Sequence, residues 1–331
     1  MDPIRLLLEQ NYQPEHFGKE YCKLHTSSQY PMFVATSLGI KPVFDDWIPV
    51  SKFDEFVQIC RQYDMVVEPD VVFRHSSKDK QNLVGGKNIT TTYQDAHPFS
   101  KESKEGTVHV FVSRSKEKVL DAKKWGWYSV IINNRSTNKP FIDNLRFGFS
   151  LGFPDCCIDF FREYNNWHYY SHPFETYKNT LPETKSFGSY HCNNYMMDRT
   201  YFLIHHLPCS YQCKKTIALG KKIEEAIQKT EPKFIECAQR ILKLPLLVFE
   251  EQNFIVCDGT LSREEEAESI SYTNCHYFPN PSRKEATIDF FDSIKKGNKV
   301  VLEQNNLVIQ QDEEVLKKIP KKENWFMIDF A

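Results

Sequence analysis

Short apolar runs and amphipathic segments alternate along residues 30–135. An apolar run between turn residues predicts a buried strand, whereas apolar residues at intervals of three and four predict a helix. The predicted strands are 32–40, 65–73, 107–114 and 128–134, and the predicted helices are 51–63 and 115–127. Because strands and helices take turns, we expect a small α/β layer. Cys60 falls on the apolar stripe of its helix, which predicts a core residue.

The pattern differs in three later places. Residues 76–106 are polar, lysine-rich and aperiodic, and we predict an exposed loop there. Helical periodicity prevails after residue 140. In the C-terminal third, 245–259 and 298–312 each predict a β-hairpin around a polar turn, with a helix over 282–296 between them.

The sequence therefore predicts a mixed α/β (α+β) protein of two domains. Residues 1–140 form the N-terminal α/β domain, which includes the exposed loop. Residues 141–331 hold a central helical segment that carries cysteines, followed by a small antiparallel β region. A length of 331 residues suffices for two medium-sized cores. A hydrophobic content of 40% with 26% charged residues is typical of folded globular proteins.

Charge and hydropathy restrict the class of protein further. The formal net charge of −2 gives no general attraction to nucleic acid or to anionic membranes. No stretch approaches the roughly 20 apolar residues that cross a bilayer. The N-terminal leucine run is too short for a secretory signal. We expect a cytoplasmic protein without membrane association. In that compartment the ten cysteines stay reduced, so metal binding or catalysis competes with simple packing as their role.

The stretch LGFPDCCIDFF, residues 151–161, places two adjacent cysteines at a predicted helix start. Pro154 and Asp155 are typical of the beginning of a helix. Cys156 and Cys157 then fall in the first turn, where free N–H groups and the helix dipole favour a thiolate. Thiolates are the form of cysteine that binds metals or attacks substrates. Packing is the competing interpretation, above all for Cys157, which lies in the middle of an apolar stripe.

The stretch HHLPCSYQC, residues 205–213, repeats the arrangement. A proline again precedes a cysteine, and we predict a helix start with Cys209 and Cys213 on one face. Burial alone would also explain these two cysteines. We nonetheless expect both pairs to converge on one metal, with Cys156, Cys157, Cys209 and Cys213 as ligands.

Two metal centres suit this set of ligands. Thiolates with a neighbouring imidazole bind zinc or an iron–sulfur cluster. If Cys157 is a core residue, three cysteines leave one position open to substrate, water or one of His205 and His206. Residue 216 is threonine, so the CxxxCxxC triplet of radical enzymes that use S-adenosylmethionine is absent.

Our preferred hypothesis is an iron–sulfur enzyme that carries out redox or sulfur-transfer chemistry on a small molecule or modified nucleoside. Cys156, Cys209 and Cys213 hold the metal in this hypothesis. Cys157 is a fourth ligand or a sulfur-carrying nucleophile, and His206 orients or protonates the reacting group.

Two alternatives come from other classes of protein. One is a structural zinc protein that binds a protein partner or RNA, and the other is a metal-free thiol–disulfide protein. His191 and Cys192 are candidates for a further ligand. His168 and His172, four residues apart, are a second possible metal pair, although Pro173 opposes a helix there.

Four segments, 39–43, 146–161, 202–213 and 245–259, together resemble a prokaryotic family of unknown function. Its members share a Pro-x-Cys-Cys motif followed by a His-x-Pro-Cys-Ser-x-x-Cys motif. The positions that the resemblance carries over are Pro154, Cys156, Cys157, His206, Pro208, Cys209, Ser210 and Cys213. The resemblance implies that the two motifs form one site, and it implies no particular reaction.

Overall fold

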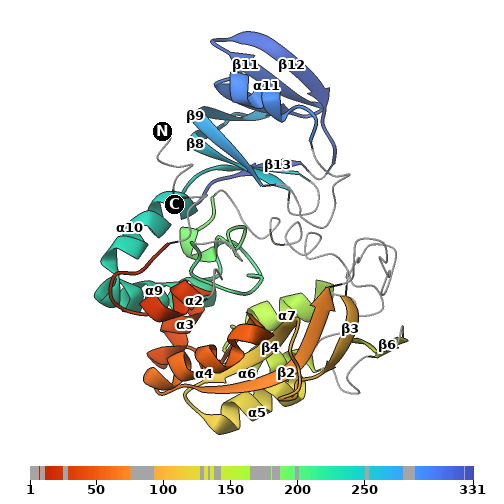
Figure 1. Ribbon diagram of the computed structural model, residues 1–331. Coiled ribbons are helices and arrows are strands. Elements are labelled where there is room, and N and C mark those ends of the chain that lie inside the picture. Colours follow the sequence, from red (N-terminus) through yellow and green to blue (C-terminus); the bar gives the residue numbers. More distant parts are fainter. Residues whose placement is uncertain are drawn as a thin grey trace.

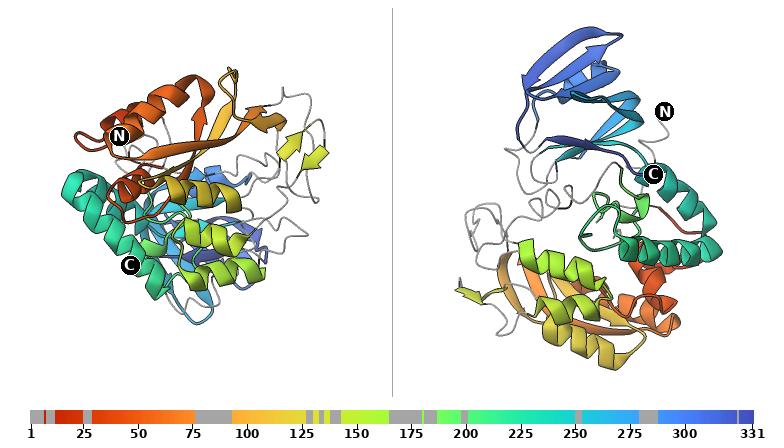
Figure 2. Two further views of the ribbon diagram at one scale, coloured as in Figure 1. Left: turned by 90° about the horizontal axis from the view of Figure 1, so that it is seen from below. Right: turned by 180° about the vertical axis from the view of Figure 1, so that it is seen from behind.

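The fold was analysed in a computed structural model (Figure 1). The structure describes residues 7, 12–24, 29–75, 93–126, 130–132, 135–137, 143–164, 180, 187–197, 201–249, 253–278, 288–323 and 325–331. Two antiparallel sheets lie at opposite ends of the molecule, with helices between them (Figures 1 and 2).

The N-terminal sheet has four strands among the described residues, in the order β1-β4-β2-β3. The strands are β1 (Phe44–Pro49), β2 (Val66–His75), β3 (Tyr93–Pro98) and β4 (Thr107–Ser113). Each neighbouring pair is antiparallel. The helices of this part are α2 (Lys19–Leu24), α3 (Tyr30–Ser37), α4 (Phe53–Gln62), α5 (Lys116–Trp125), α6 (Asn144–Ser150) and α7 (Asp155–Tyr164). Val50–Lys52 form the 3-10 turn η1 before α4.

Helices cover both faces of this sheet because β4 is apolar on both faces. Successive side chains of a strand point to opposite sides. Val110 and Val112 join the main core together with Phe56 of α4. Phe111 instead packs with Val119 of α5 in a second, smaller core. The sheet thus lies between α4 on one face and α5 with α6 on the other.

The C-terminal sheet has seven strands in the part of the chain that the structure describes, in the order β12-β11-β10-β9-β8-β7-β13. The strands are β7 (Leu246–Val248), β8 (Phe254–Arg263), β9 (Ala267–Phe278), β10 (Lys299–Glu303), β11 (Asn306–Gln311), β12 (Glu314–Pro320) and β13 (Phe326–Ile328). Helix α11 (Phe291–Lys296) packs against β9 and β11. The sequence predicted only a small β region here, whereas the structure has a seven-stranded sheet.

Two further helices and two short elements complete the described chain. Helices α9 (Lys214–Thr230) and α10 (Pro232–Leu242) lie between the sheets, next to the 3-10 turn η2 (Tyr190–Cys192). Strands β5 (Val130–Ile132) and β6 (Arg135–Thr137) form a separate hairpin. One buried cluster includes residues of both large sheets, such as Val110 and Val256, and of α10, such as Phe234.

The sequence-based elements are confirmed in part. The helices predicted over 51–63 and 115–127 correspond to α4 and α5, and both predicted hairpins are present as β7–β8 and β10–β11. The mixed α/β class is also confirmed. The strand predicted over 32–40 is wrong, because this segment forms helix α3. Every residue of α3 is buried, so its apolar run has no polar face that would reveal the helical period.

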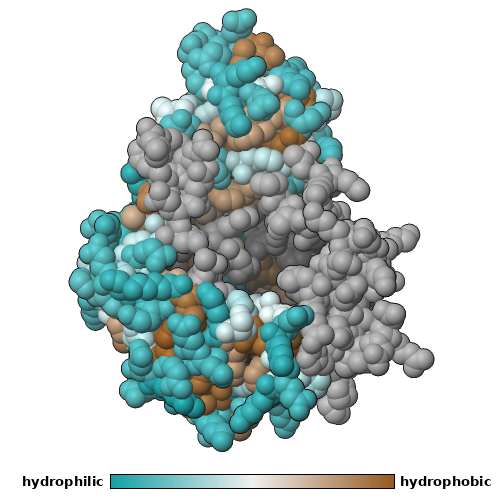
Figure 3. All heavy atoms as spheres, viewed as in Figure 1, coloured by the Kyte–Doolittle hydropathy of each residue, from teal (hydrophilic) through white to brown (hydrophobic). Residues whose placement is uncertain are grey.

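The loop predicted over 76–106 is also wrong in its C-terminal part, which contains β3. Residues 76–92 of that prediction lie outside the described residues, as do residues 282–287 of the predicted helix before α11. Among the described residues every helix is too short or too polar to span a bilayer. Hydrophilic side chains cover most of the visible described surface, and hydrophobic patches lie both over the N-terminal part and over the C-terminal sheet (Figure 3).

Candidate metal centre

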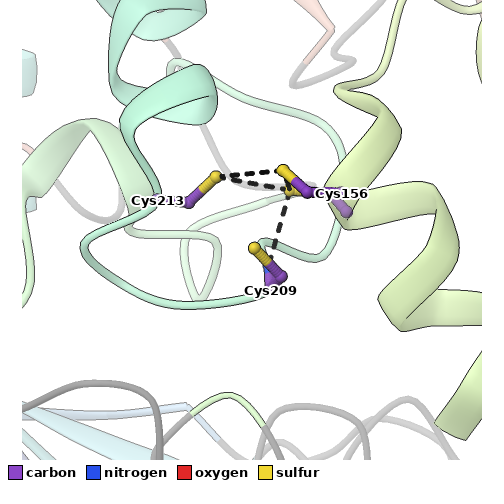
Figure 4. A group of neighbouring side chains, drawn as sticks. Cys156, Cys209 and Cys213 are labelled. Carbon is purple, nitrogen blue, oxygen red and sulfur yellow. Dashed lines mark hydrogen bonds between the residues drawn. The ribbon is translucent and has the colours of Figure 1, made fainter.

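Four cysteines from two distant segments of the chain meet at one point (Figure 4). Cys156 and Cys157 lie in the first turn of α7, whereas Cys209 and Cys213 lie in the segment that leads into α9. The four Sγ atoms all lie within 4.8 Å of one another. The predicted convergence of the two motifs is confirmed. The individual roles assigned to the four residues stay predictions.

The sulfur atoms are close without being bonded to one another. The Sγ of Cys213 lies 3.6 Å from the Sγ of Cys156 and 3.7 Å from that of Cys157. The Sγ atoms of the adjacent Cys156 and Cys157 are 4.0 Å apart. A disulfide requires about 2.05 Å, so all four cysteines are free thiols. The backbone N–H of Cys209 donates to the Sγ of Cys157 over 3.4 Å.

The start of α7 follows from its sequence. Pro154 precedes the helix, and its carbonyl accepts the N–H groups of Cys157 and Ile158, each over 3.0 Å. Asp155 is the first helical residue, and its carboxylate accepts from the Lys215 ammonium of α9 over 2.5 and 2.7 Å. This hydrogen bond lowers the pKa of the Asp155 carboxyl. The ion pair joins the first turns of the two helices beside the cysteines.

The second pair of cysteines corrects one prediction. Residues 205–213 are not helical, and α9 begins only at Lys214, so Cys209 does not lie on a helix. Cys213 is the residue that caps α9, and its carbonyl accepts the N–H of Ile217 over 2.9 Å. The carbonyl of Ser210 accepts the N–H of Cys213 over 3.0 Å. The chain therefore turns back on itself between the two cysteines, and this turn brings their sulfur atoms together.

This turn is held by the last residues of the chain. The Ser189 N–H donates to the carbonyl of Tyr211 over 2.8 Å, and the buried Tyr211 hydroxyl donates to the Tyr195 hydroxyl over 3.0 Å. Gly188 exchanges backbone hydrogen bonds with Asp329 and Ala331. A C-terminal segment thus supports a cysteine turn more than a hundred positions earlier, a contact that no local pattern reveals.

The four thiols differ in acidity. Hydrogen bonds with Cys157 and Cys209, together with Thr216, hold the pKa of the Cys213 thiol well below its usual range. The N-terminus of α9 adds to this effect, because the helix dipole favours an anion there. The pKa of Cys157 is raised by its hydrogen bonds with Cys209 and Cys213 and by burial. One thiolate is thus available to a cation, and a bound metal then displaces the protons of the other thiols.

A buried polar pair lies behind the cysteines. The Oγ1 of Thr216 lies 3.3 Å from the Sγ of Cys157 and 3.0 Å from the Nε2 of His206. The ring of His206 is centred 5.1 Å from that of Phe153. Burial, aided by the charge of Lys41, lowers the pKa of His206 to about 3, so the ring is neutral at physiological pH. Because its Nε2 contacts Thr216 and it is not part of the group of four, His206 lies behind the sulfur ligands and not among them.

The loop between α6 and α7 is anchored by a buried lysine. The ammonium of Lys41 donates to the carbonyl of Leu151 over 2.5 Å and lies 4.9 Å from the centre of the Phe153 ring. Burial lowers the pKa of Lys41 to about 8. Gly152 has a φ of 73°, and a Cβ there would lie 2.5 Å from the Pro42 Cδ. Only glycine fits this turn, which sets the direction in which the cysteine pair enters α7.

The other residues proposed as ligands have different positions. His191 contacts the carboxylate of Glu224 over 2.6 Å, and Cys192 lies with its Sγ 4.0 Å from the carbonyl of Cys213, outside the group of four. His168 and His172 lie outside the described residues. Cys60 is fully buried, as predicted.

Sequence reasoning missed Thr216 and Lys41 as neighbours of the site. The signal for Thr216 was its spacing of three from Cys213, which places both on the first turn of one helix. Lys41 had no such signal, since its position depends on the fold of the N-terminal part.

No protein-family model, curated protein or solved structure matches the chain. The arrangement itself defines a compact site of four thiols, able to hold a metal ion. The resemblance to a prokaryotic family with the same two motifs stays a prediction.

Proposed function

We propose that this protein binds a single zinc ion through the thiolates of Cys156, Cys157, Cys209 and Cys213. The separation of the sulfur atoms carries the proposal. A zinc–thiolate bond is about 2.3 Å long, so a tetrahedral site places its sulfur atoms about 3.8 Å apart. The three separations among Cys156, Cys157 and Cys213, which are 3.6, 3.7 and 4.0 Å, match this value, and the Sγ of Cys209 lies within 4.8 Å of the other three. Four thiolates are also a ligand set that structural zinc sites use.

The same spacing supports one ion over an iron–sulfur cluster. A cluster inserts several iron and sulfide atoms between the cysteines, so its ligating sulfur atoms stand further apart than those of a single ion. All four Sγ atoms here lie within 4.8 Å of one another. To accept a cluster, α7 and the turn before α9 would have to separate. The iron–sulfur centre preferred from sequence thus has less support than its zinc alternative.

The ion would act as a cross-link between distant parts of the chain. It would join the start of α7 to the start of α9, two elements that are also linked by the exposed pair of Asp155 and Lys215 and by the contact of Cys157 with Thr216. A four-thiolate site leaves no open position, which catalysis at the metal requires. Redox or sulfur-transfer chemistry is the second candidate, favoured by the partial exposure of Cys156 and Cys209. That exposure allows a reagent to reach two of the four sulfur atoms.

Metal analysis of the full chain, purified without oxygen, tests the proposal. We expect a colourless protein with one zinc per chain and no acid-labile sulfide. Serine variants of each of the four cysteines should lower the zinc content to well below one. Cys237→Ser is the matched control, because Cys237 is also partly buried but lies outside the group of four. It should retain its zinc.

Three results would contradict the proposal. Brown protein with iron and sulfide in equal amounts would replace the single ion with a cluster. Protein without metal, in which all four thiols react with an alkylating agent, would point to a thiol–disulfide function. Equal zinc loss in Cys237→Ser and Cys156→Ser would show that the zinc is not held by the group of four.

A further inference from the structure

Two of the four cysteines, Cys157 and Cys213, interact with a polar side chain outside the group, that of Thr216. The Sγ of Cys157 lies 3.3 Å from the Oγ1 of Thr216, which lies 3.0 Å from the Nε2 of His206. These three side chains form a line that runs from the sulfur into the core. Thr216 is fully buried, and His206 is 6% exposed.

The protons that each of these three side chains carries determine which atom donates in each hydrogen bond. A metal-bound Cys157 is a thiolate, which only accepts. The Thr216 hydroxyl has one proton, so it donates that proton to the sulfur. Its oxygen is then free to accept, and the Nε2–H of His206 is the donor within reach. The line therefore assigns the proton of the histidine ring to Nε2.

The other nitrogen of the ring agrees with this assignment. The Nδ1 of His206 is buried and has no hydrogen-bond partner. A proton on Nδ1 would add a buried donor without an acceptor, and a cationic ring would also lie near the buried ammonium of Lys41. The Phe153 ring packs at a tilt of 33° against the imidazole and holds its orientation.

We propose that Thr216 and His206 are positioning residues for the metal ligand Cys157. The Thr216 hydroxyl donates to the thiolate sulfur, and His206 fixes the hydroxyl in the orientation in which it donates. This inference rests on the proposed metal function. Hydrogen-bonded partners of metal ligands typically contribute 10- to 100-fold to metal affinity, and their effect is strong where water is excluded.

The decisive comparison is between Thr216→Val and Thr216→Ser. Valine keeps the shape of threonine and removes the hydroxyl, whereas serine keeps the hydroxyl. Zinc affinity is measured by competition with a coloured chelator. We expect Thr216→Val to bind zinc about 10- to 100-fold more weakly than wild type. Thr216→Ser should stay within a few-fold of wild type, which a purely steric role of this side chain would not predict.

A spectroscopic readout separates the hydrogen bond from general damage to the site. Cobalt bound by thiolates has a sulfur-to-metal charge-transfer band, whose energy falls when a thiolate loses a hydrogen bond. We expect this band to move to longer wavelength in Thr216→Val and not in Thr216→Ser. The cobalt d–d bands should keep the intensity of a tetrahedral site in both variants.

His206→Leu provides a second, independent variant if Thr216→Val fails to fold. It removes the donor to Thr216 without touching a cysteine, and we expect a smaller loss of zinc affinity with a band shift in the same direction. Wild-type affinity and an unshifted band in the folded variants would overturn this inference. Failure of wild type to bind any metal would instead overturn the proposed function, so the two failures are distinguishable.

Discussion

At the scale of single residues, a buried histidine outside the cysteine group lies between two carboxylates on neighbouring strands. His109 lies on β4 and is fully buried. Its Nε2 lies 3.2 Å from a carboxylate oxygen of Asp45 on β1, and its Nδ1 lies 3.7 Å from one of Asp70 on β2. The group therefore joins three strands of the N-terminal sheet by charge as well as by the backbone ladder.

The pKa of His109 predicts a pH dependence of stability. Burial alone lowers this pKa, but the hydrogen bonds and charges of Asp45 and Asp70 outweigh burial and raise it above the usual value. A raised folded-state pKa means that the stabilisation is fully present below the unfolded pKa of about 6.5. It is lost as the pH rises through the folded-state pKa.

We expect the free energy of unfolding to fall between pH 6 and pH 9 in wild type, and we expect this slope to shrink in His109→Gln. That variant should also lose about 3 kcal/mol at pH 6, because two buried or half-buried carboxylates lose their cation. Urea titrations at the two pH values measure both effects. An unchanged slope in the variant would show that other groups cause the pH dependence.

At the scale of elements, the position of the cysteine pair depends on the packing of α6 against α7. Gly148 lies inside α6, where glycine costs about 1 kcal/mol relative to alanine. A Cβ there would lie 2.7 Å from the Cγ1 and 2.9 Å from the Cδ1 of Ile158 on α7. Glycine thus lets the two helices approach closely, and Ile158 is the residue directly after the cysteine pair.

Gly148→Ala is therefore expected to destabilise the protein although alanine is the better helix former. Overpacking typically costs about 1–3 kcal/mol, which exceeds the gain in helix propensity. Chemical unfolding measures the loss. The double variant Gly148→Ala with Ile158→Ala removes the clash, so adding Gly148→Ala to an Ile158→Ala background should stabilise the chain. A stabilising effect of Gly148→Ala in wild type would refute the close approach.

At the scale of the whole molecule, a metal ion would link segments that the chain order separates. Cys156 and Cys157 belong to α7, which packs against α6. Cys209 and Cys213 belong to a segment that the C-terminal residues support through Gly188. An ion that binds only the folded state adds its binding free energy to the stability of the entire arrangement.

Removal of the ion should therefore lower the melting temperature of wild type. At free zinc about 1,000-fold above the dissociation constant, the bound ion contributes about 4 kcal/mol to the free energy of unfolding. Calorimetry with and without a zinc chelator measures this difference. Cys213→Ser should melt lower than wild type and respond little to the chelator. An equal melting temperature of wild type in both conditions would show that no ion stabilises the fold.

Prediction from the sequence succeeded where one local pattern determines one element. Helix α4 is one example, because its apolar stripe is buried and its other face is exposed. The hairpin of β10 and β11 is another, because a polar turn separates two apolar runs. Sequence-based prediction was wrong for α3, which is buried on all sides, and it gave no element at β12, whose residues are almost all exposed. In both elements the apolar and polar positions do not alternate, so the period carries no information.

Local sequence patterns were enough to predict the four cysteines of the group, because each pair lies in a stretch of about ten residues in which a proline precedes the cysteines. Tertiary structure decided the separations of the sulfur atoms, the contact of Cys157 with Thr216, and the position of His206 behind the ligands. These distances depend on how α7 and α9 pack, and on the contacts made by Lys41 and by residues 329–331. Such packing results from many weak interactions between distant segments, so it cannot be predicted from any short stretch of sequence.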